Sequence, residues 1–277
     1  MKIFTISDLH YNTDNHRRLS NLASYLFANA KKSDVLLLLG DYGNNVNDIQ
    51  KCLTLFLNFP EKKLAIMGNH DLWEYENPNT PKRVISLMSL FERLGFHSLD
   101  REPVVINDIG FTGSIGWYDY SFLHEKDNID LIQYMYKIYP GEEYPAWKDA
   151  IYCNWNTSDV SIVNCLLEKL MMHLNSLRGI EKVFVGMHHV PTNRLLFQPR
   201  FLLPKKWRFL NAFLGSNKFS ELINTYTNVS TVLCGHIHRR KVVDFLGKKY
   251  ISLGDSSDKC DMSVHDVDTD TYKFVSF

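Results

Sequence analysis

The sequence predicts an α/β protein with two packed β-sheets flanked by helices, and two observations lead to this fold class. In the first half of the chain, short apolar segments alternate with segments whose apolar residues recur at helical spacing, which is the pattern of βαβ units. From residue 231 onward, short strand-like segments are separated only by turns, which is typical of antiparallel strands.

The first half is expected to form a buried parallel sheet covered by helices. Its apolar runs are continuous, as in strands that are buried on both faces, and they predict strands at residues 2–7, 35–39 and 64–67. Apolar residues three and four positions apart predict helices at residues 16–30, 46–57 and 81–94. The last helix begins with Pro81 and stops before Gly95, where these residue types favour a helix start and end.

The second half is expected to add a further helix and a second sheet. A hairpin is predicted at residues 104–106 and 110–112, and an amphipathic helix at 160–177 leads into a strand at 182–187. The tail is predicted to form an antiparallel second sheet packed on the first, from strands at 231–234, 241–245, 250–253, 262–267 and 272–277.

Residues 1–277 are predicted to form a single domain with two irregular segments. The first, at about 117–157, is rich in tryptophan and tyrosine. It is interpreted as an insertion with an aromatic core of its own, or as a lid in which Trp117 and Tyr118 stack on a planar group of a substrate. The second, at about 190–218, is basic and has no acidic residue. It is a solvated or subunit-contacting face, or a rim that attracts phosphate through Arg194 and Arg200.

Composition excludes several classes of partner. Lys plus Arg and Asp plus Glu number 31 each, so no overall charge would recruit nucleic acid or an acidic membrane. No segment approaches the ~18 consecutive apolar residues of a membrane span, and the N-terminus lacks the pattern of a signal peptide. The five cysteines form no Cys-x-x-Cys pair, which argues against a disulfide framework. We expect a cytoplasmic protein without membrane contact.

Short polar clusters follow the strand-like runs and predict a metal site. They are Asp8-Leu9-His10, Gly40-Asp41, Gly68-Asn69-His70-Asp71 and Gly235-His236-Ile237-His238, and His188 follows another run. Side chains at strand ends gather along one edge of an α/β sheet, where such proteins bind ligands. Carboxylates and imidazoles suit zinc, manganese and iron. If the backbone is extended, alternate side chains point the same way, so we expect Asp8 and His10 to reach one ion together and His236 and His238 to point between two ions.

These clusters, in this order, resemble those of the calcineurin-like metallophosphoesterase superfamily. The resemblance extends from Asp8 to His238. It implies a four-layer α/β/β/α sandwich of two mixed sheets and a pair of divalent ions, Mn, Fe or Zn. The first ion would be held by Asp8, His10, Asp41 and His238. The second would share Asp41 and be held also by Asn69, His188 and His236.

The resemblance implies a metal-dependent phosphoric ester hydrolase, in which a hydroxide that bridges the two ions attacks phosphorus. Protein phosphatases continue Gly-Asp with Tyr-Val-Asp-Arg-Gly, whereas this chain continues with Tyr42-Gly43-Asn44-Asn45, which disfavours a protein substrate. The repair nucleases of the superfamily carry a large extra domain after Gly-His-x-His, whereas about four short strands are predicted after this motif here. This difference disfavours a processive DNA nuclease. We expect a small or nucleotide phosphodiester as substrate. The alternatives are a phosphomonoesterase and a non-catalytic scaffold that keeps the fold.

Three residues near the ligands have roles that the sequence leaves open or only suggests. His70 is the expected catalytic residue, placed to donate a proton to the leaving oxygen or to stabilise it. Asp71 either orients His70 or caps the segment that follows. Of the neighbours His188 and His189, only one is expected to face the site, and His188 is chosen because the family's ligand is the first histidine after the apolar run.

Overall fold

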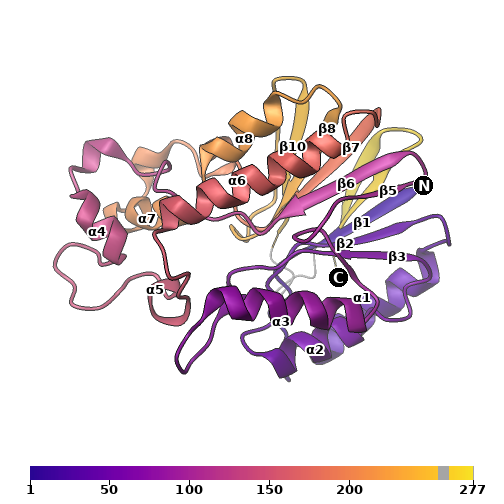
Figure 1. Ribbon diagram of the computed structural model, residues 1–277, viewed down its shortest axis with the longest axis horizontal. Helices are drawn as coiled ribbons and strands as arrows, with labels where there is room; N and C mark the ends of the chain where they lie inside the picture. The colour runs from indigo at the N-terminus through magenta and orange to yellow at the C-terminus, as the bar shows by residue number, and fades with distance from the viewer. Residues whose placement is uncertain (255–261, 277) are drawn as a thin grey trace.

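Two mixed β-sheets face each other in the computed structural model, which describes residues 1–254 and 262–276 (Figure 1). The first sheet has the order β12-β11-β1-β2-β3-β4, in which β1 to β4 run parallel and β11 and β12 are antiparallel. Its strands are β1 (Lys2–Ile6), β2 (Val35–Leu38), β3 (Lys62–Ala65), β4 (His97–Ser98), β11 (Met262–Asp266) and β12 (Thr271–Val275). The predicted fold class is confirmed.

The second sheet has the order β5-β6-β7-β8-β10-β9, with four central parallel strands and an antiparallel strand at each edge. Its strands are β5 (Val104–Ile106), β6 (Ile109–Ser114), β7 (Lys182–Met187), β8 (Val229–Cys234), β9 (Lys241–Phe245) and β10 (Lys248–Ser252). Both sheets therefore have a parallel centre, and the carboxyl ends of their central strands can carry a shared site.

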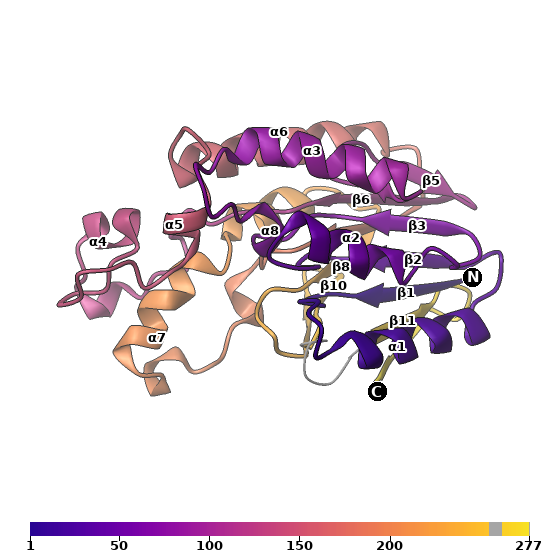
Figure 2. The same cartoon turned by 90° about the horizontal axis from the view of Figure 1, so that it is seen from below.

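Helices cover the outer face of each sheet (Figures 1 and 2). The first sheet is covered by α1 (His16–Asn29), α2 (Val46–Thr54) and α3 (Thr80–Arg93), and the second by α6 (Asp159–Ser176) and α8 (Asn217–Asn224). Three short helices project at one end of the molecule: α4 (Leu131–Tyr136), α5 (Asp149–Tyr152) and α7 (Lys205–Leu210). Single 3-10 turns lie at Glu125–Asp127, His70–Leu72, Asn193–Leu195, Arg200–Leu202 and Asn211–Phe213. Among the described residues, no helix is long and apolar enough to span a membrane.

Strand β2 shows why the central segments are apolar throughout. Val35 and Leu37 pack in the layer between the sheets, together with Phe184 and Leu233 from the second sheet. Leu36 and Leu38 face the other way and pack with residues of the covering helices. Because alternate side chains of a strand enter two different cores, every position must be apolar.

The prediction of an antiparallel second sheet built from the whole tail is wrong. Strand β10 pairs parallel with β8, and β11 and β12 leave this sheet to pair next to β1 in the first one. Apolar alternation identifies a strand but carries no information on its neighbour. By pairing with β1, strand β11 covers an edge that would otherwise be left unpaired.

The two irregular segments pack on each other at the end of the molecule that carries α4 and α7. Their rings form a shared aromatic core, in which Tyr134 stacks on Phe209 with ring centroids 4.7 Å apart. Charges pair between the same segments: Arg208 binds both oxygens of Asp127 at 2.5–3.0 Å, and Lys206 pairs with Glu142. Arg208 and Lys206 of the second segment are thus neutralised by acidic residues of the first.

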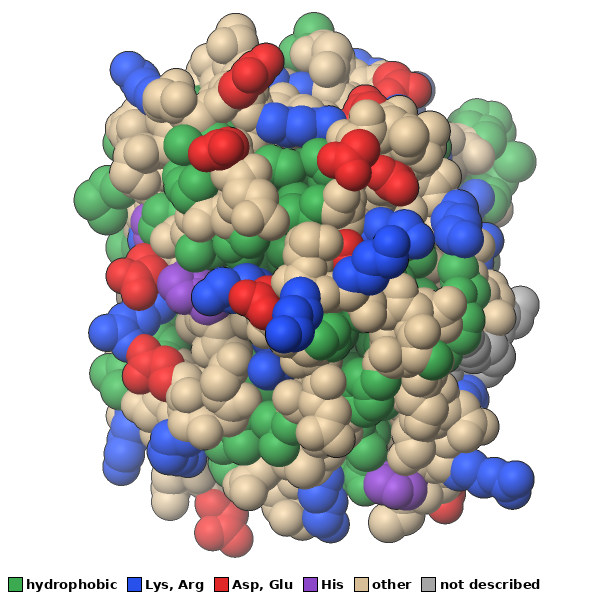
Figure 3. Space-filling model, turned by 90° about the vertical axis from the view of Figure 1, so that its right-hand side faces the viewer, with side chains coloured by type: hydrophobic (Ala, Val, Ile, Leu, Met, Phe, Trp, Pro, Cys, Tyr) green, Lys and Arg blue, Asp and Glu red, His purple; other side chains and the backbone are tan. Residues whose placement is uncertain are grey.

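At the opposite end of the molecule, charged side chains of both signs are intermixed. Figure 3 views this end, and lysine or arginine side chains lie there among aspartate and glutamate side chains. The described residues on this face therefore form no large patch of a single sign, in keeping with the balanced composition.

Candidate metal centre

Five parallel strands deliver the polar clusters to one place. Asp8 and His10 follow β1, Asp41 follows β2, Asn69 and His70 follow β3, His188 follows β7, and the segment from His236 to His238 follows β8. The two sheets are joined at this point, because His188 Nδ1 lies 2.8 Å from the Leu39 carbonyl oxygen and the His236 N–H donates to Asp8 at 3.0 Å. The clusters therefore meet where the carboxyl ends of both sheets converge.

One group of ligand-type atoms forms around Asp8. His10 Nε2 and His238 Nε2 lie 3.2 Å apart, and His238 Nε2 lies 3.5 Å from Asp8 Oδ1. Asp8 is fully buried, whereas the His238 side chain is 41% exposed. This group is therefore buried on the side of Asp8 and open to solvent on the side of His238.

A second group forms around His188 on the buried side. His188 Nε2 lies 3.1 Å from Asn69 Oδ1, 3.2 Å from His236 Nδ1 and 3.4 Å from Asp41 Oδ2. Asp41 Oδ2 is also 3.6 Å from His10 Nε2 in the first group. One carboxylate oxygen of Asp41 thus stands between the two groups.

The donor atoms fit a pair of divalent ions. Ligands bound at about 2.0–2.1 Å from one ion are separated by roughly 3.0–3.4 Å from each other, which is close to the 3.1–3.6 Å observed here. The donors are carboxylate, carboxamide and imidazole groups, which are ligand types that such ions take. The Asp8, His10 and His238 set and the Asp41, His188 and His236 set each bring their ligand atoms within 4.8 Å of one another.

The electrostatics of the site favour positive charge. Burial opposes ionisation of Asp41, yet the neighbouring imidazoles, His188 first, hold the pKa of this carboxyl well below its usual range. Burial likewise disfavours the charged form of His188, but the Asp41 carboxylate raises its pKa to about 9. The two buried carboxylates, Asp8 and Asp41, therefore stay ionised and form a negative centre. Such a centre binds cations.

Left-handed backbone, and not an extended segment, aims these side chains. The φ angles are +56° at Asp8, +41° at His10, +57° at Asp41, +72° at His236 and +49° at His238. The expectation of an extended Asp-x-His is therefore wrong, although Asp8 and His10 do share a group. His236 and His238 also separate, since His236 joins the His188 group and His238 joins the His10 group. Such strained positions typically cluster at functional sites.

Two motif glycines leave room for the carboxylates. A Cβ on Gly68 would lie 2.1 Å from Asp41 Oδ1, and a Cβ on Gly235 would lie 1.8 Å from Ser7 Oγ and 2.6 Å from Asp8 Oδ2. No side chain fits at either position without displacing a ligand-type carboxylate. The motif glycines are therefore part of the geometry of the site.

His70 lies on the open side of the site. A ring nitrogen of His70 groups with ligand atoms of His10 and Asp41, its Nδ1 lies 2.9 Å from Asn44 Oδ1, and its ring stacks on Trp73 at 3.8 Å. Burial lowers the pKa of His70 to about 4. The partner that orients this ring is thus Asn44, which the sequence analysis did not single out.

Asp71 performs neither of the two roles considered for it. Its carboxylate accepts the N–H groups of Asp41, Tyr42 and Gly68 at 2.8–2.9 Å, so it clamps two ligand-bearing loops together. A side chain that bonds backbone N–H groups of another loop cannot be recognised from sequence spacing alone.

His188 and His189 diverge as expected of strand neighbours. His189 Nδ1 lies 3.0 Å from the Ile115 carbonyl oxygen, and its ring packs 4.9 Å from Trp117. Among the described residues, His189 belongs to none of the three groups of ligand-type atoms. It supports the floor beneath His236, whose ring lies 4.4 Å away.

Asp149, from the aromatic segment, is a contact that the sequence analysis missed. This fully buried carboxylate accepts hydrogen bonds from Asn69 Nδ2 at 2.9 Å, from Trp73 Nε1 at 2.7 Å and from Trp147 Nε1 at 2.7 Å. Because Asn69 donates its amide nitrogen to Asp149, its Oδ1 must face His188. No local motif marks Asp149, since it lies 80 positions from Asn69 in the chain.

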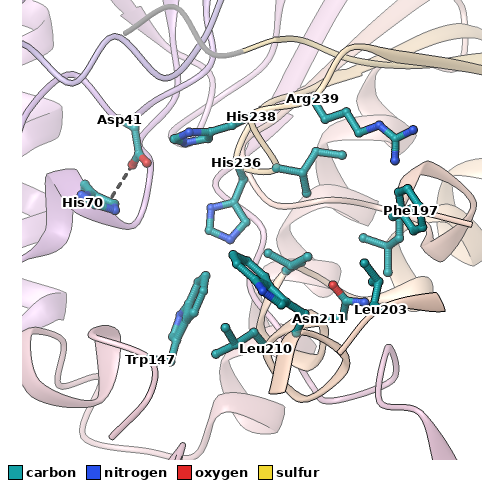
Figure 4. Close-up of a pocket in the computed structure, with 14 residues that line it drawn as sticks. Asp41, His70, Trp147, Phe197, Leu203, Leu210, Asn211, His236, His238 and Arg239 are labelled. Carbon is teal, nitrogen blue, oxygen red and sulfur yellow. Dashed lines mark hydrogen bonds between the residues drawn. The ribbon is translucent and has the colours of Figure 1, made fainter. Parts of the chain in front are cut away.

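A cavity of about 490 Å³ opens on the site (Figure 4). It is lined by Asp41, His70, His236 and His238, and also by Trp147, Asn211 and Arg239, which the sequence analysis did not propose. Asn211 and Trp147 lie in the two segments that the sequence marks as irregular. This irregularity is the sequence signal that could have pointed to them. Arg239 is the residue that directly follows the last histidine of the motif.

Of the four predicted substrate contacts, the three whose side chains the structure describes, Trp117, Tyr118 and Arg194, do not line this cavity. Trp117 and Tyr118 are 1% and 0% exposed, and they belong to the aromatic core and to a second cavity within the insertion. Arg194 is exposed, and its guanidinium lies over the Phe245 ring at 4.0 Å. The side chain of Arg200 lies outside the described part of the structure. Most rings of the aromatic segment belong to an aromatic core, which is the first interpretation of this segment. Trp147 is the residue of the segment that lines the cavity.

Similar structures share this fold. A phosphopantetheinyl hydrolase from Mycobacterium tuberculosis is 20% identical, covers 91% of this chain and 89% of its own, and superposes with a TM-score of 0.73. A dimetal phosphatase from Danio rerio is 14% identical, covers 100% and 95%, and has a TM-score of 0.58. A putative 5′-nucleotidase from Staphylococcus aureus is 12% identical, covers 99% and 52%, and has a TM-score of 0.53.

Sequence comparison identifies the family directly. Among curated proteins, none matches this sequence significantly. The sequence profile of the calcineurin-like phosphoesterases, however, matches residues 1–240. This match contains every polar cluster that the strands bring together at the site. The chain therefore belongs to the calcineurin-like phosphoesterase family.

Proposed function

We propose that this protein is a metal-dependent hydrolase of phosphodiesters, with two divalent ions bound by the converging clusters. The observation that carries the proposal is Asp41 Oδ2, which lies 3.6 Å from His10 Nε2 and 3.4 Å from His188 Nε2, between the two groups of ligand-type atoms. Asp8, His10, Asp41 and His238 would hold one ion. Asp41, Asn69, His188 and His236 would hold the other. Manganese, iron and zinc all suit such donors.

The chain's own residues would prepare the site for hydrolysis. Bound divalent ions supply a water of lowered pKa and neutralise charge on the phosphoryl group. Asp41 keeps Oδ2 available to both ions because its Oδ1 accepts the His70 N–H at 2.9 Å. His70, on the open side, stands where a leaving oxygen would emerge. To donate there from Nε2, a neutral His70 must accept a hydrogen bond at Nδ1. This requires the Asn44 amide to be turned from the orientation in which its Oδ1 lies 2.9 Å from Nδ1.

A diester is preferred over a monoester because of the charge of the cavity. Beyond the metal-ligand cluster and His70, Arg239 is the single cationic side chain among the described residues that line it. A diester carries one negative charge and a monoester up to two, so the lining beyond the ions, with Arg239, balances the charge of a diester more fully than that of a monoester. The apolar part of the wall also accommodates one of the two organic groups that a diester carries.

The test compares bis(p-nitrophenyl) phosphate with p-nitrophenyl phosphate. The protein is stripped with a chelator and reloaded with manganese, zinc or iron, and bound metal is measured by elemental analysis. We expect up to two ions per chain and faster diester turnover, both lost in Asp41→Asn. His97→Gln, on the edge strand β4, is the matched control and should retain both. Faster monoester turnover would make the protein a phosphatase, and metal binding without turnover would support a scaffold.

A further inference from the structure

The cavity beside the metal centre has two unlike ends (Figure 4). Asp41, His70 and His238 lie at one end, and Phe197, Leu203 and Arg239 lie at the other. A group bound to the ions would thus extend along the cavity toward this far end. The space of about 490 Å³ holds an organic substituent and not only a phosphate.

The wall beyond the metal centre is almost entirely apolar. It is formed by side chains that include Trp147, Leu196, Leu203, Trp207, Leu210 and Ile237. These residues come from both irregular segments and from the histidine motif. Trp207 is 61% exposed even though it lines the cavity, so this wall continues to the surface.

Two polar side chains interrupt the apolar wall among the described lining residues. Arg239 is exposed, and its guanidinium lies 5.0 Å from the centre of the Phe197 ring, at the far end. Asn211 is 8% exposed, and its Nδ2 is buried without a hydrogen-bond partner among the described residues. Buried donors are almost always paired. Because Asn211 lines the cavity, a rotation of its amide group would let Nδ2 reach an acceptor of a bound molecule.

We propose that this cavity binds the organic group of the phosphate ester, and that this group is mainly apolar and carries one hydrogen-bond acceptor for Asn211. The inference rests on the proposed function, because the metal centre anchors the phosphate. It narrows the substrate class, since a nucleoside presents several hydroxyl and base-edge groups, and Asn211 and Arg239 are the polar side chains that the described part of this wall offers them. Desolvating those groups without partners would weaken binding.

The test measures binding of phosphonates, whose P–C bond is not hydrolysed, to the manganese-loaded protein by isothermal titration calorimetry. Methylphosphonate, phenylphosphonate and (4-acetylphenyl)phosphonate share the anchor and differ in the organic group, and adenosine monophosphate supplies the nucleoside. We expect phenylphosphonate to bind at least ~10-fold more tightly than methylphosphonate, since a ring is buried. The acetyl compound should bind a further few-fold more tightly, and the nucleotide more weakly than phenylphosphonate.

Two substitutions locate the effect. Trp207→Asp should remove most of the preference for phenyl over methyl, whereas Phe201→Asp should not. Phe201 is the matched control, because it is 69% exposed on the same segment and does not line the cavity. Asn211→Leu should abolish only the extra affinity of the acetyl compound. If that variant does not fold, the acetyl-to-phenyl ratio of the unaltered protein tests Asn211 by itself.

The outcomes separate this inference from the function on which it rests. Equal affinity for methyl and phenyl compounds, tighter binding of the nucleotide, or an effect of Phe201→Asp equal to that of Trp207→Asp would overturn the inference and leave the phosphodiesterase intact. Absence of binding by every phosphonate, methylphosphonate included, would overturn the proposed function and this inference with it.

Discussion

At the scale of single residues, hydrogen bonds within the protein fix the orientation of the ligand-type side chains. Asp8 accepts the His236 N–H, Asp41 accepts the His70 N–H, and Asn69 donates to Asp149. The bonds of Asp41 and Asn69 each leave one particular oxygen facing the site, whereas the His236 N–H contacts both oxygens of Asp8, at 3.0 and 3.1 Å. Supporting contacts of this kind set ligand orientation and strongly affect metal affinity.

Asp149 provides a direct test of this support. Asp149→Asn keeps the volume but has one acceptor oxygen in place of two, while Asn69, Trp73 and Trp147 still need acceptors. We expect metal affinity to fall roughly 10- to 100-fold, measured by titration against a metal-sensitive dye. Asp159→Asn is the control, because Asp159 also accepts from buried Trp117, Tyr120 and Lys137 but contacts no ligand. An equal loss in both variants would reduce Asp149 to a purely structural role.

His70 can be separated from the metal ligands by substitution. His70→Ala should keep the metal content and lose about 100- to 10,000-fold in turnover on diesters with poor leaving groups. The loss should be smaller with p-nitrophenol, which leaves readily without help. Rates on alkyl and nitrophenyl diesters, compared with metal content, check this, and unchanged turnover would remove His70 from the mechanism.

At the scale of elements, the aromatic and basic segments act as one unit that forms a wall of the cavity. A phosphate-attracting rim is one of two interpretations of the basic segment, and two of its cations pair with acidic residues instead, Arg208 with Asp127 and Lys206 with Glu142. These ion pairs and the Tyr134–Phe209 stack hold α7 against the insertion. The cations therefore position the apolar wall.

The Arg208–Asp127 pair should affect stability and not substrate binding. The hydrogen bond from Arg208 holds the pKa of Asp127 below its usual range. The ionised pair therefore stabilises the fold above the unfolded pKa of Asp, ~3.9, and this contribution is lost as the pH falls through the lower folded pKa. We expect Asp127→Asn to lower the Tm by a few degrees at pH 7, with unchanged KM.

The difference in Tm between Asp127→Asn and the unaltered protein should shrink below pH ~4. Thermal melts at a series of pH values measure it. Asp244→Asn, which breaks an exposed pair with Lys249, is the control and should have little effect. A raised KM in Asp127→Asn would restore a role for this segment in attracting phosphate.

At the scale of the whole molecule, the two sheets meet in a site that neither completes. The first sheet contributes Asp8, Asp41 and Asn69, and the second contributes His188 and His236. Bound ions would therefore cross-link the sheets, and ligands that bind only the folded state stabilise it.

Removing metal should thus destabilise the protein. At a free metal concentration of 100 times the Kd, binding contributes about 2.7 kcal/mol, so the Tm of the stripped protein should be roughly 5–10 °C lower. Differential scanning calorimetry with and without a chelator measures this shift, and His236→Gln should abolish most of it. A chelator effect of equal size in His236→Gln would place the stabilising metal elsewhere.

The sequence by itself determined the described strands except β4, the main helices and the ligand clusters, because apolar periodicity and motif spacing are local properties of the chain. The tertiary structure alone decided that β11 and β12 join the first sheet, that Asp149 orients Asn69, and that Trp147, Asn211 and Arg239 line the cavity. These are contacts between positions distant in sequence, and they depend on strand pairing and packing that no local pattern encodes.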